Sequence, residues 1–535
     1  MTWRLDDPMG DEARKVVWDV VQYLRGTVLD LGCGPRKVLP HAVGVDSGKD
    51  TELFGIQIQP DVRVDDCADL PDFESGVCDA VFSSHLLEHI VDTERALAEW
   101  WRVLKAGGHL VLYLPHRDLY PRIGQPGANP DHKHDFAPDD VLTHIASVAA
   151  ASGTGMDVLV NQTRDAGIEY SFLLVVQKLA EIDCRASYKA PRPEKTCCIS
   201  RFGGFGDMLQ MANLLPELKR QGYHITINTT PGGQEIVKHD PHIDDWLIVD
   251  PDQVPNHELP LFWEALGRRF DKFVQLSESV EGTLLAMPGR ANHMWPQNVR
   301  QVVLNKNYLE WTSFLAELPY HSEARFYPTP EEAGRAQGFI SAIALARQPQ
   351  DRMIGMPNAR VFTIMWALAG SSVHKFTPHM DAVIARVLLE IPEAVIILAG
   401  DPACKILEEG WEVEPRVYCE SGKQTIRETL ALAQKVDLVI GPETGVLNAV
   451  AFEEDVAKVV MLSHSSPENL TKHWFTTTAL APAGTSCYPC HMLHYGKAYC
   501  NTDQVTGAAQ CQVDITPGEI FEAVAAYYQS WKDYP

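Results

Sequence analysis

Two segments of this 535-residue sequence share one pattern, in which a short apolar strand leads into a glycine-rich turn and then a helix. The first is VLDLGCGPRK at 28–37, and the second is CCISRFGGFGDMLQMANLL at 197–215. Glycine allows the tight turn and the close approach of a ligand to the backbone at such a junction. Further apolar strands alternate with helices after each turn, which is typical of parallel sheets covered by helices on both faces. The pattern therefore predicts an α/β fold.

The strand pattern divides the chain into three α/β segments, in line with its length at about 100–200 residues per domain. We predict domains at 1–180, 196–358 and 359–535, with a charged linker containing two prolines at 181–195. The first domain is predicted to contain helices at 12–24 and 93–108 and strands at 27–32, 42–46, 79–84, 109–115 and 170–179. The other two are predicted to contain further strands at 246–250, 272–278, 361–370, 394–400 and 437–441.

The chain is acidic, with 46 Lys+Arg against 71 Asp+Glu and a net charge of −25. Such a surface repels phosphate backbones, which argues against a sequence-independent nucleic-acid binder or a polybasic membrane-surface protein. The longest apolar runs, such as AVIILAG at 394–400, are far shorter than the ~20 residues that span a bilayer. The first residues also lack the apolar core of a signal peptide. We expect a cytoplasmic protein with no transmembrane segment and no nucleic-acid partner.

Acidic residues follow the first glycine turn in an order that suits a nucleoside. Asp30 ends the first strand beside Gly32 and Gly34, and Asp46 ends the second strand, where a carboxylate can bind both hydroxyls of a ribose. The segment DDCADLP at 65–71 places acids where an adenine amino group can be held, and DAVFSSHLLEHI follows at 79–90.

This ordered set resembles the class I S-adenosylmethionine-dependent methyltransferases over about residues 10–180. The resemblance implies a seven-stranded Rossmann-like sheet with the cofactor across the carboxyl ends of its strands. The implied cofactor-binding residues are Asp30, Gly32 and Gly34 at the methionine and ribose, Asp46 at the ribose diol, Asp66 and Cys67 at the adenine, and Ser84 and His85 after the fourth strand. A dinucleotide oxidoreductase is the weaker interpretation, because Arg36 stands at the third glycine position of the NAD fingerprint.

Three histidines are candidates for the base that an oxygen or nitrogen acceptor of a methyl group would benefit from. His116 follows the fifth strand, and His132 and His134 lie in NPDHKHDF. Each can equally form local hydrogen bonds or face solvent. The DHKHD segment can also ligate a metal, although methyl transfer from a sulfonium requires none.

The second glycine turn contains Asp207, at a helix start where an acid can accept a proton from an incoming hydroxyl or simply stabilise the helix dipole. In ALAGSSVHKFTP at 367–378, the amides of Gly370, Ser371 and Ser372 can bind a pyrophosphate, to which Lys375 adds a charge. A helix, a strand and another glycine-containing turn follow at 421–451, and SHSSPENL lies at 463–470.

These segments together resemble glycosyltransferase family 9, the ADP-heptose:lipopolysaccharide heptosyltransferase-like enzymes, over about residues 196–535. The resemblance implies a GT-B fold of two Rossmann-like halves, with the nucleotide sugar mainly on the C-terminal half. It also implies metal-independent transfer that inverts the anomeric centre. By position, Asp207 matches the catalytic base, Lys375 the phosphate-contacting lysine, and Thr425 a residue on the nucleotide side.

The nucleotide-sugar signature departs from the family at two positions. Thr444 and Gly445 match it, but Glu443 replaces the aspartate and Asn448 replaces the histidine. Glu443 keeps the charge with a longer reach, whereas Asn448 keeps hydrogen bonding without proton transfer. A non-catalytic module that binds a nucleotide or glycan is therefore the alternative to an active glycosyltransferase.

Cysteines are organised only near the C-terminus, in CYPCHMLHYGKAYC and a later cysteine. Cys487, Cys490, Cys500 and Cys511 can offer four thiolates to a structural zinc ion, although their spacing also allows free or oxidised thiols. Taken together, the sequence predicts a bifunctional enzyme that transfers a methyl group and a sugar to a glycan or glycoconjugate. A scaffold protein that retains both modules without activity is a further alternative.

Overall fold

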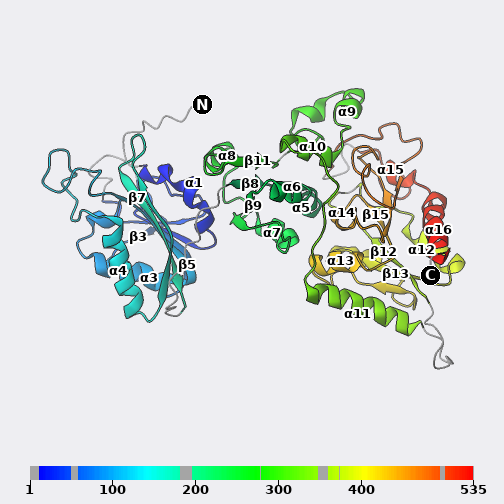
Figure 1. Ribbon diagram of the computed structural model, residues 1–535, viewed down its shortest axis with the longest axis horizontal. Coiled ribbons are helices and arrows are strands. Elements are labelled where there is room, and N and C mark those ends of the chain that lie inside the picture. Colours follow the sequence, from blue (N-terminus) through cyan, green and yellow to red (C-terminus); the bar gives the residue numbers. More distant parts are fainter. Residues whose placement is uncertain are drawn as a thin grey trace. The chain divides into compact units, whose positions relative to one another are not determined.

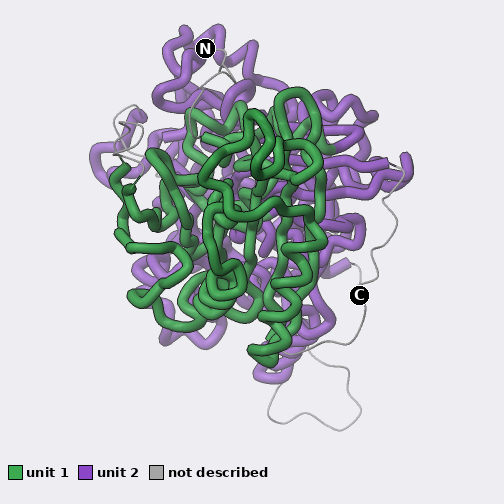
Figure 2. The backbone as a smooth tube through the Cα atoms, turned by 90° about the vertical axis from the view of Figure 1, so that its left-hand side faces the viewer, with its two compact units in different colours: residues 1–192, 248–269 green, residues 193–247, 270–535 purple. Residues whose placement is uncertain are grey.

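The computed structural model describes residues 11–49, 58–180, 195–277, 279–347, 360–372, 374–494 and 500–533. The chain forms two compact units, one of residues 1–192 with 248–269 and the other of residues 193–247 with 270–535 (Figure 2). Residues 181–194 of the predicted linker lie outside the described residues. In the described part of the chain, no helix is both long and apolar enough to cross a lipid bilayer.

The first unit is built on one seven-stranded sheet (Figure 1). Its strands are β1 (Val28–Leu31), β2 (Val43–Asp46), β3 (Val62–Arg63), β4 (Cys78–Ser84), β5 (Leu104–Pro115), β6 (Gly155–Arg164) and β7 (Ser171–Leu179). They lie in the order β3-β2-β1-β4-β5-β7-β6, and only β7 runs antiparallel to its neighbours. The order reverses between β1 and β4, and parallel α/β sheets bind ligands at the carboxyl ends of strands beside such a switch point.

Two helices of the first unit differ from their predicted lengths. The predicted helix at 12–24 is broken into η1 (Glu12–Lys15), α1 (Val17–Val20) and η2 (Val21–Tyr23). The predicted helix at 93–108 ends earlier, because Leu104 already pairs with Cys78 in the sheet and Gly107 has φ +85°. The other helices of this unit are η3 (Leu87–His89), α3 (Thr93–Val103), α4 (Pro138–Ala151) and α8 (Leu259–Gly267).

Residues 248–269 belong to the first unit although they follow the second glycine turn in sequence. Phe262 of α8 lies edge-on to Trp18 of α1, with ring centroids 6.0 Å apart. The Gln253 amide donates hydrogen bonds to the carbonyls of Val21 and Leu24 at 2.6 and 2.7 Å. These contacts cover the end of the α1 segment, where the Val21 carbonyl also accepts the Leu24 N–H at 3.1 Å and the Leu24 carbonyl lies 3.2 Å from the His41 Nε2.

The N-terminal half of the second unit contains a four-stranded sheet of β8 (Thr196–Ser200), β9 (His224–Thr229), β10 (Asp245–Ile248) and β11 (Lys272–Gln275). The strand order is β10-β9-β8-β11, so its switch point lies between β8 and β11. The helices are α5 (Phe205–Ala212), α6 (Leu215–Arg220), α7 (Pro231–Val237), η4 (Ala291–Met294), α9 (Gln297–Val303), α10 (Tyr308–Leu315) and α11 (Pro330–Ala346).

The C-terminal half contains a parallel six-stranded sheet of β12 (Phe362–Ala367), β13 (Ala394–Ala399), β14 (Val417–Cys419), β15 (Leu438–Pro442), β16 (Ala457–Met461) and β17 (Thr477–Leu480). The order β14-β13-β12-β15-β16-β17 is the doubly wound arrangement, with its switch point between β12 and β15. The helices are α12 (Met380–Glu390), η5 (Pro402–Leu407), α13 (Ile426–Ala433), α14 (Gly445–Ala449), α15 (Gln510–Val513) and α16 (Pro517–Asp533).

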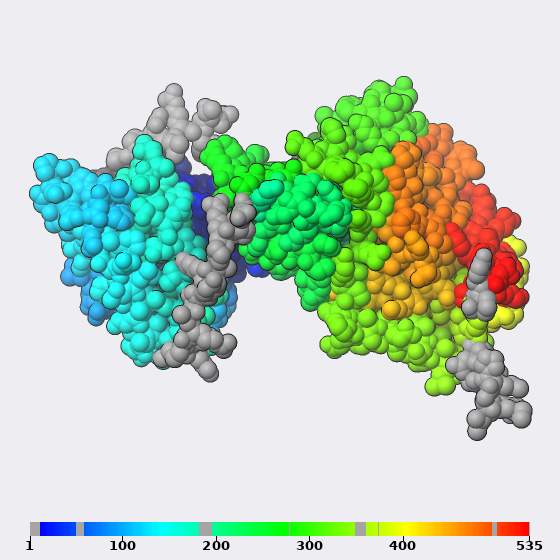
Figure 3. Space-filling view, viewed as in Figure 1, coloured from blue at the N-terminus to red at the C-terminus, as the bar shows by residue number. Residues whose placement is uncertain are grey.

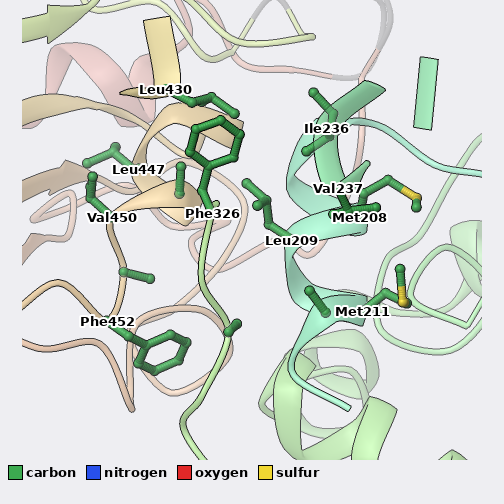
Figure 4. Close-up of a cluster of buried hydrophobic side chains, with 14 of the residues drawn as sticks. Met208, Leu209, Met211, Ile236, Val237, Phe326, Leu430, Leu447, Val450 and Phe452 are labelled. Carbon is green, nitrogen blue, oxygen red and sulfur yellow. The ribbon is translucent and has the colours of Figure 1, made fainter. Parts of the chain in front are cut away.

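One apolar core joins the two halves of the second unit. Leu209 of α5 and Ile236 of α7 share it with Phe326, and Leu430 and Leu447 enter it from the C-terminal half (Figure 4). In Figure 3 the green residues of the N-terminal half meet the orange residues of the C-terminal half without a grey segment between them. Two Rossmann-like halves on a common core confirm the predicted GT-B arrangement of the second unit, and the first unit has the predicted Rossmann-like sheet.

A buried arginine also ties the halves together. Arg427 of α13 is 1% exposed, and it forms two hydrogen bonds of 2.8 Å with the carboxylate of Glu332 on α11. The same guanidinium donates to the carbonyls of Ile236 and Tyr327 at 2.9 and 2.7 Å. Because these acceptors all lie in the N-terminal half, Arg427 fixes α13 of the C-terminal half against it.

Candidate functional site

The first glycine turn lies at the switch point of the seven-stranded sheet. Gly32 and Gly34 follow β1 with φ of +68° and +57°, in the left-handed region that glycine adopts without strain. A Cβ on Gly34 would meet no atom within 4 Å, so the backbone is open on that side. The turn therefore has room for a ligand against its backbone.

Asp46 at the end of β2 organises this turn. Its Oδ2 accepts a hydrogen bond from the Gly34 N–H at 3.0 Å, and its Oδ1 accepts one from the Gly48 N–H at 2.7 Å. A carboxylate has about four acceptor positions. The two that remain on Asp46 match a pair of ribose hydroxyls, so the residues present fit a nucleoside.

Asp30 is almost completely buried, with 3% of its surface exposed. Its Oδ2 accepts a hydrogen bond of 2.6 Å from the Val38 N–H. Burial raises the pKa of this carboxyl to about 7. A nearby cation, such as a sulfonium or an ammonium group, stabilises the ionised form.

This raised pKa predicts how cofactor binding depends on pH. We expect the affinity for S-adenosylmethionine to fall about tenfold from pH 8 to pH 6, because the cationic ligand requires ionised Asp30 and binding must then release its proton. In the ligand-free protein the same shift makes folding stability decrease from about pH 4 to pH 7, since the unfolded chain loses that proton first. Titration calorimetry in two buffers measures the released proton, and Asp30→Asn should remove both effects; an unchanged pH profile in that variant contradicts the prediction.

The predicted adenine-side residues lie beside β2. The Cys67 Sγ is 3.9 Å from the Val45 carbonyl, and burial raises the pKa of the thiol to about 12, so it stays neutral. Trp100 donates its indole N–H to the Cys67 carbonyl at 2.8 Å, which holds this loop on the sheet. Asp66 is exposed and accepts a hydrogen bond from the Ala68 N–H at 2.9 Å.

Ser84 and His85 lie at the end of β4, on the other side of the switch point. His85 has φ +49°, a strained conformation for a residue with a side chain. Its Nδ1 is 3.4 Å from the Ser84 hydroxyl and its Nε2 is 3.2 Å from the Ser171 hydroxyl. Burial lowers the pKa of His85 to about 3, so the ring is neutral near pH 7.

A cavity of about 100 Å³ opens beside His85. It is lined by His85, Glu88, His89, Pro115, Tyr120, Asn129, His132 and Tyr170. Of the three predicted base candidates, only His132 is among these residues. The Nδ1 of His116 instead accepts a hydrogen bond from the Asp118 N–H at 3.1 Å, and the Nε2 of His134 is 3.1 Å from the Val91 carbonyl.

Sequence reasoning missed Glu88 and His89, which lie within the quoted segment DAVFSSHLLEHI. Glu88 is fully buried, and burial raises its pKa to about 8. The sequence did contain a sign of a buried acid, because Glu88 lies between the apolar residues Leu87 and Ile90, which are themselves buried. It was missed because the neighbours of this segment come from a loop more than 40 residues later in the chain, which no local pattern shows.

In the second unit, Asp207 lies in the first turn of α5, after the β8 strand. Its Oδ2 accepts a hydrogen bond from the Gly204 N–H at 2.7 Å, and its Oδ1 lies 2.7 Å from the Arg201 guanidinium. Arg201 is 2% exposed and also pairs with Glu281 at 3.0 and 3.1 Å. Sequence reasoning missed this arginine, which holds the predicted base in one position.

Lys375 follows β12 in the C-terminal half, at the switch point beside β15. Burial lowers the pKa of its ammonium group, while the negative charges of Glu443 and Asp207 oppose that shift. The charges of Glu443 and Asp207, two other predicted site residues, therefore both act on Lys375. Gly370 is required here because a Cβ would lie 2.5 Å from the Lys375 side chain.

Glu443 directly follows β15, but its carboxylate points into the protein. It accepts hydrogen bonds from the backbone N–H groups of Ser463 and Ser465 at 2.9 and 3.1 Å and lies 2.5 Å from the His464 Nδ1. Burial alone would raise the pKa of Glu443, but His464 and these hydrogen bonds lower it, so the group stays ionised. The His374 Nε2 is 3.1 Å from the same His464 nitrogen.

The two predicted glycine turns of the second unit meet across its halves. A Cβ on Gly445 would lie 3.0 Å from the Phe205 Cβ, and one on Gly206 would lie 3.0 Å from the Asn448 amide nitrogen. The Gln210 amide of α5 is 3.4 Å from the Asn448 Oδ1. Gly445 and Asn448 therefore lie where α14 packs against α5.

The remaining predicted nucleotide-sugar residues are less closely grouped. Ser371 is exposed, whereas the hydroxyls of Ser372 and Thr444 are buried without a hydrogen-bond partner. Thr425 is exposed and forms the capping box of α13 with Glu428. Its hydroxyl is therefore already used at the helix start.

The four C-terminal cysteines influence one another electrostatically. Burial, followed by the neighbouring Cys500, Cys490 and Cys487, raises the pKa of the Cys511 thiol. Among the described residues, however, the one group of three or more potential metal ligands with all donor atoms within 4.8 Å is Glu88, His89 and His132. The structure does not bring the four sulfurs to that proximity.

Comparison with known proteins identifies the first unit. The methyltransferase domain family model matches residues 29–112, so the chain contains a methyltransferase domain. An uncharacterized 37.1 kDa protein in transposon TN4556 of Streptomyces fradiae is 36% identical over 107 residues, which cover 17% of this chain and 31% of that protein. The chain thus spans about a third of the length of this curated relative.

Solved structures with similarity to this chain fall into two groups. A glycosyltransferase family 9 structure from Veillonella parvula has 13% identity and a TM-score of 0.45, and the match covers 64% of this chain and 100% of that one. An S-adenosylmethionine-dependent methyltransferase from Mesorhizobium loti has 16% identity and a TM-score of 0.24, with 30% of this chain and 96% of that one covered.

Proposed function

We propose that this chain transfers methyl groups from S-adenosylmethionine in its first unit and glycosyl groups from a nucleotide sugar in its second. The acceptor is a glycan or glycoconjugate. The observation that supports this best is that charged side chains lie at the switch points of the sheets in both units. Asp30 and Asp46 are acidic, as a cationic cofactor requires, whereas Lys375 supplies a positive charge for a pyrophosphate.

In the first unit the cofactor supplies a methyl group on a sulfonium, and the protein's task is to hold the acceptor against it. Asp46 binds the ribose diol and Asp30 faces the positive charge. His85 is neutral and, with His132, lines the cavity beside the switch point. We place the acceptor hydroxyl in this cavity.

In the second unit we propose inverting, metal-independent transfer. Asp207 accepts the proton of the acceptor hydroxyl, and Arg201 holds its carboxylate in position. Lys375 and the amides of Gly370, Ser371 and Ser372 bind the diphosphate, while Glu443 shapes the site from within. A zinc ion held by Cys487, Cys490, Cys500 and Cys511 would stabilise the C-terminal segment; metal analysis of the purified chain tests this part.

The experiment follows a methyl label in cells and tests ligand binding with the purified chain. Cells carrying the gene are supplied with methyl-labelled S-adenosylmethionine precursor, and labelled material is separated into glycan, protein and nucleic acid. The purified chain is screened by thermal shift against S-adenosylmethionine and ADP-, GDP- and UDP-sugars, because a ligand that binds the native state raises the melting temperature. We expect methyl label on glycan and a shift with one nucleotide sugar.

Variants separate the two units. Asp207→Asn is expected to abolish glycosyl transfer and leave methyl transfer intact, because it touches only the second unit. If Asp207→Ala and Lys375→Ala leave the product unchanged, the second unit is a non-catalytic binding module. Methyl label found only on protein or nucleic acid would contradict the proposed acceptor.

A further inference from the structure

Three side chains that line the cavity of the first unit can act as metal ligands. The Glu88 Oε1 is 3.9 Å from the His89 Nε2 and 4.0 Å from the His132 Nε2. The rings of His89 and His132 are nearly perpendicular, with centroids 4.8 Å apart. One carboxylate oxygen and two imidazole nitrogens thus converge on a common point.

The backbone holds this convergence in place. The carbonyl of Glu88 accepts hydrogen bonds from the N–H groups of Lys133 and His134 at 2.8 and 3.2 Å. This pairing anchors the loop that contains His132 directly on η3, which contains Glu88 and His89. Main-chain contacts therefore hold together the two segments that contain the three side chains.

Glu88 is the strongest sign of a ligand. It is 0% exposed, and both of its carboxylate oxygens lack a hydrogen-bond partner. A buried carboxyl group without a partner costs considerable free energy. A cation bound at this point would satisfy the carboxylate, and the adjacent cavity of about 100 Å³ gives it a path of entry.

His89 has the second contact that metal-binding histidines usually make. Its Nε2 faces Glu88, and its Nδ1 lies 3.0 Å from the Asp131 Oδ2. A carboxylate on the far nitrogen orients the ring and fixes the tautomer that leaves the other nitrogen free to coordinate a metal. Asp131 is thus placed as a positioning residue.

We propose that Glu88, His89 and His132 bind one divalent transition-metal ion of the zinc class, with an open coordination position facing the cavity. Ligand atoms around tetrahedral zinc are about 3.3 Å apart, so binding would draw the three side chains together by roughly half an ångström. Three protein ligands and one open position are typical of catalytic sites. The open position suits a hydroxyl oxygen of the acceptor, which the metal would make more acidic.

Metal binding itself tests this inference, separately from any transfer activity. The purified full-length chain is stripped with a chelator, loaded with Co²⁺ and examined by metal analysis and visible spectroscopy. We expect one equivalent of Co²⁺ whose spectrum lacks thiolate charge-transfer bands, in addition to any Co²⁺ that the C-terminal cysteines bind. Cys487→Ser combined with Cys490→Ser removes any contribution of the C-terminal cysteines and should leave this equivalent unchanged.

Variants then assign the ligands. Glu88→Gln and His132→Gln should each lose this equivalent, and Asp131→Asn, which keeps all three ligands, should weaken it by about 10- to 100-fold. His144→Gln is the matched control, because His144 forms a pair of 3.5 Å with the exposed Glu94 in the same unit. Circular dichroism shows whether each variant is folded. The proposal is overturned if every bound ion has thiolate bands, or if Glu88→Gln and Asp131→Asn bind as tightly as the parent chain.

Discussion

Replacing Asp46 with alanine is expected to weaken the binding of S-adenosylmethionine by at least a hundredfold. The change removes the acceptors of the Gly34 and Gly48 N–H groups and the positions available to the ribose hydroxyls. A hydrogen bond to a charged group contributes about 1.5–3 kcal/mol. Losing two such bonds to the ribose corresponds to about 3–6 kcal/mol, which is more than two powers of ten in affinity.

Equilibrium dialysis with labelled cofactor measures this loss. Asp46→Asn keeps the shape and one acceptor, so its affinity should lie between those of the parent and the alanine variant. Asp69→Asn is the control, because Asp69 forms only an exposed ion pair of 2.8 Å with Arg95. An Asp46→Ala chain that binds the cofactor within threefold of the parent would exclude Asp46 from the site.

Replacing Arg427 with methionine is expected to destabilise the second unit by about 3–5 kcal/mol, the usual cost of removing one partner of a buried ion pair. The change leaves the Glu332 carboxylate and the carbonyls of Ile236 and Tyr327 without their donor. Urea unfolding followed by fluorescence should show an earlier transition. If the variant instead unfolds at the same urea concentration as the parent, the two halves are held together by the apolar core alone.

The matched control for Arg427 is Arg335→Met. Arg335 joins the same two helices through Glu428 at 3.0 Å, but its side chain is 52% exposed. Such an exposed pair contributes at most about 1 kcal/mol, so this variant should unfold almost like the parent.

The pH dependence of stability gives an independent check on Arg427. Burial alone would raise the pKa of Glu332, but the ion pair with Arg427 lowers this pKa to about 2. The unfolded chain has the ordinary value near 4.5, so the pair stabilises the protein fully above that pH and less as pH falls toward 2. In the Arg427→Met variant this acid-dependent part of the stability should decrease to what the hydrogen bond from the Thr329 N–H to Glu332 still supports.

The parts of the fold that were predictable are those set by neighbouring residues. Gly34 and Asp46 lie at or just after the ends of strands that short apolar runs define, and strand ends meet at one edge of a parallel sheet. The same reasoning placed Lys375 after β12 and Asp207 in the first turn of α5. These positions need only the local sequence and the doubly wound order.

What could not be predicted depends on contacts between distant residues. Glu443 was expected to face the nucleotide, yet its carboxylate points to His464 and the amides around it, because the segment after β16 folds over it. Glu88 and His132 meet because the 131–135 loop forms backbone hydrogen bonds with the Glu88 carbonyl, which is distant in sequence. The helix predicted at 93–108 ends early because Leu104 pairs with Cys78 in the sheet, a contact that the local helix pattern does not reveal.

The contacts of Gln253 and Phe262 with the α1 region have a consequence for how the chain can be divided. A fragment that stops near residue 180 lacks the segment 248–269, so it exposes the Trp18 face and leaves the carbonyls of Val21 and Leu24 without the Gln253 amide. No single cut releases the methyltransferase domain intact. The two units are interleaved in sequence. A continuous fragment that keeps all of one unit therefore also keeps a piece of the other.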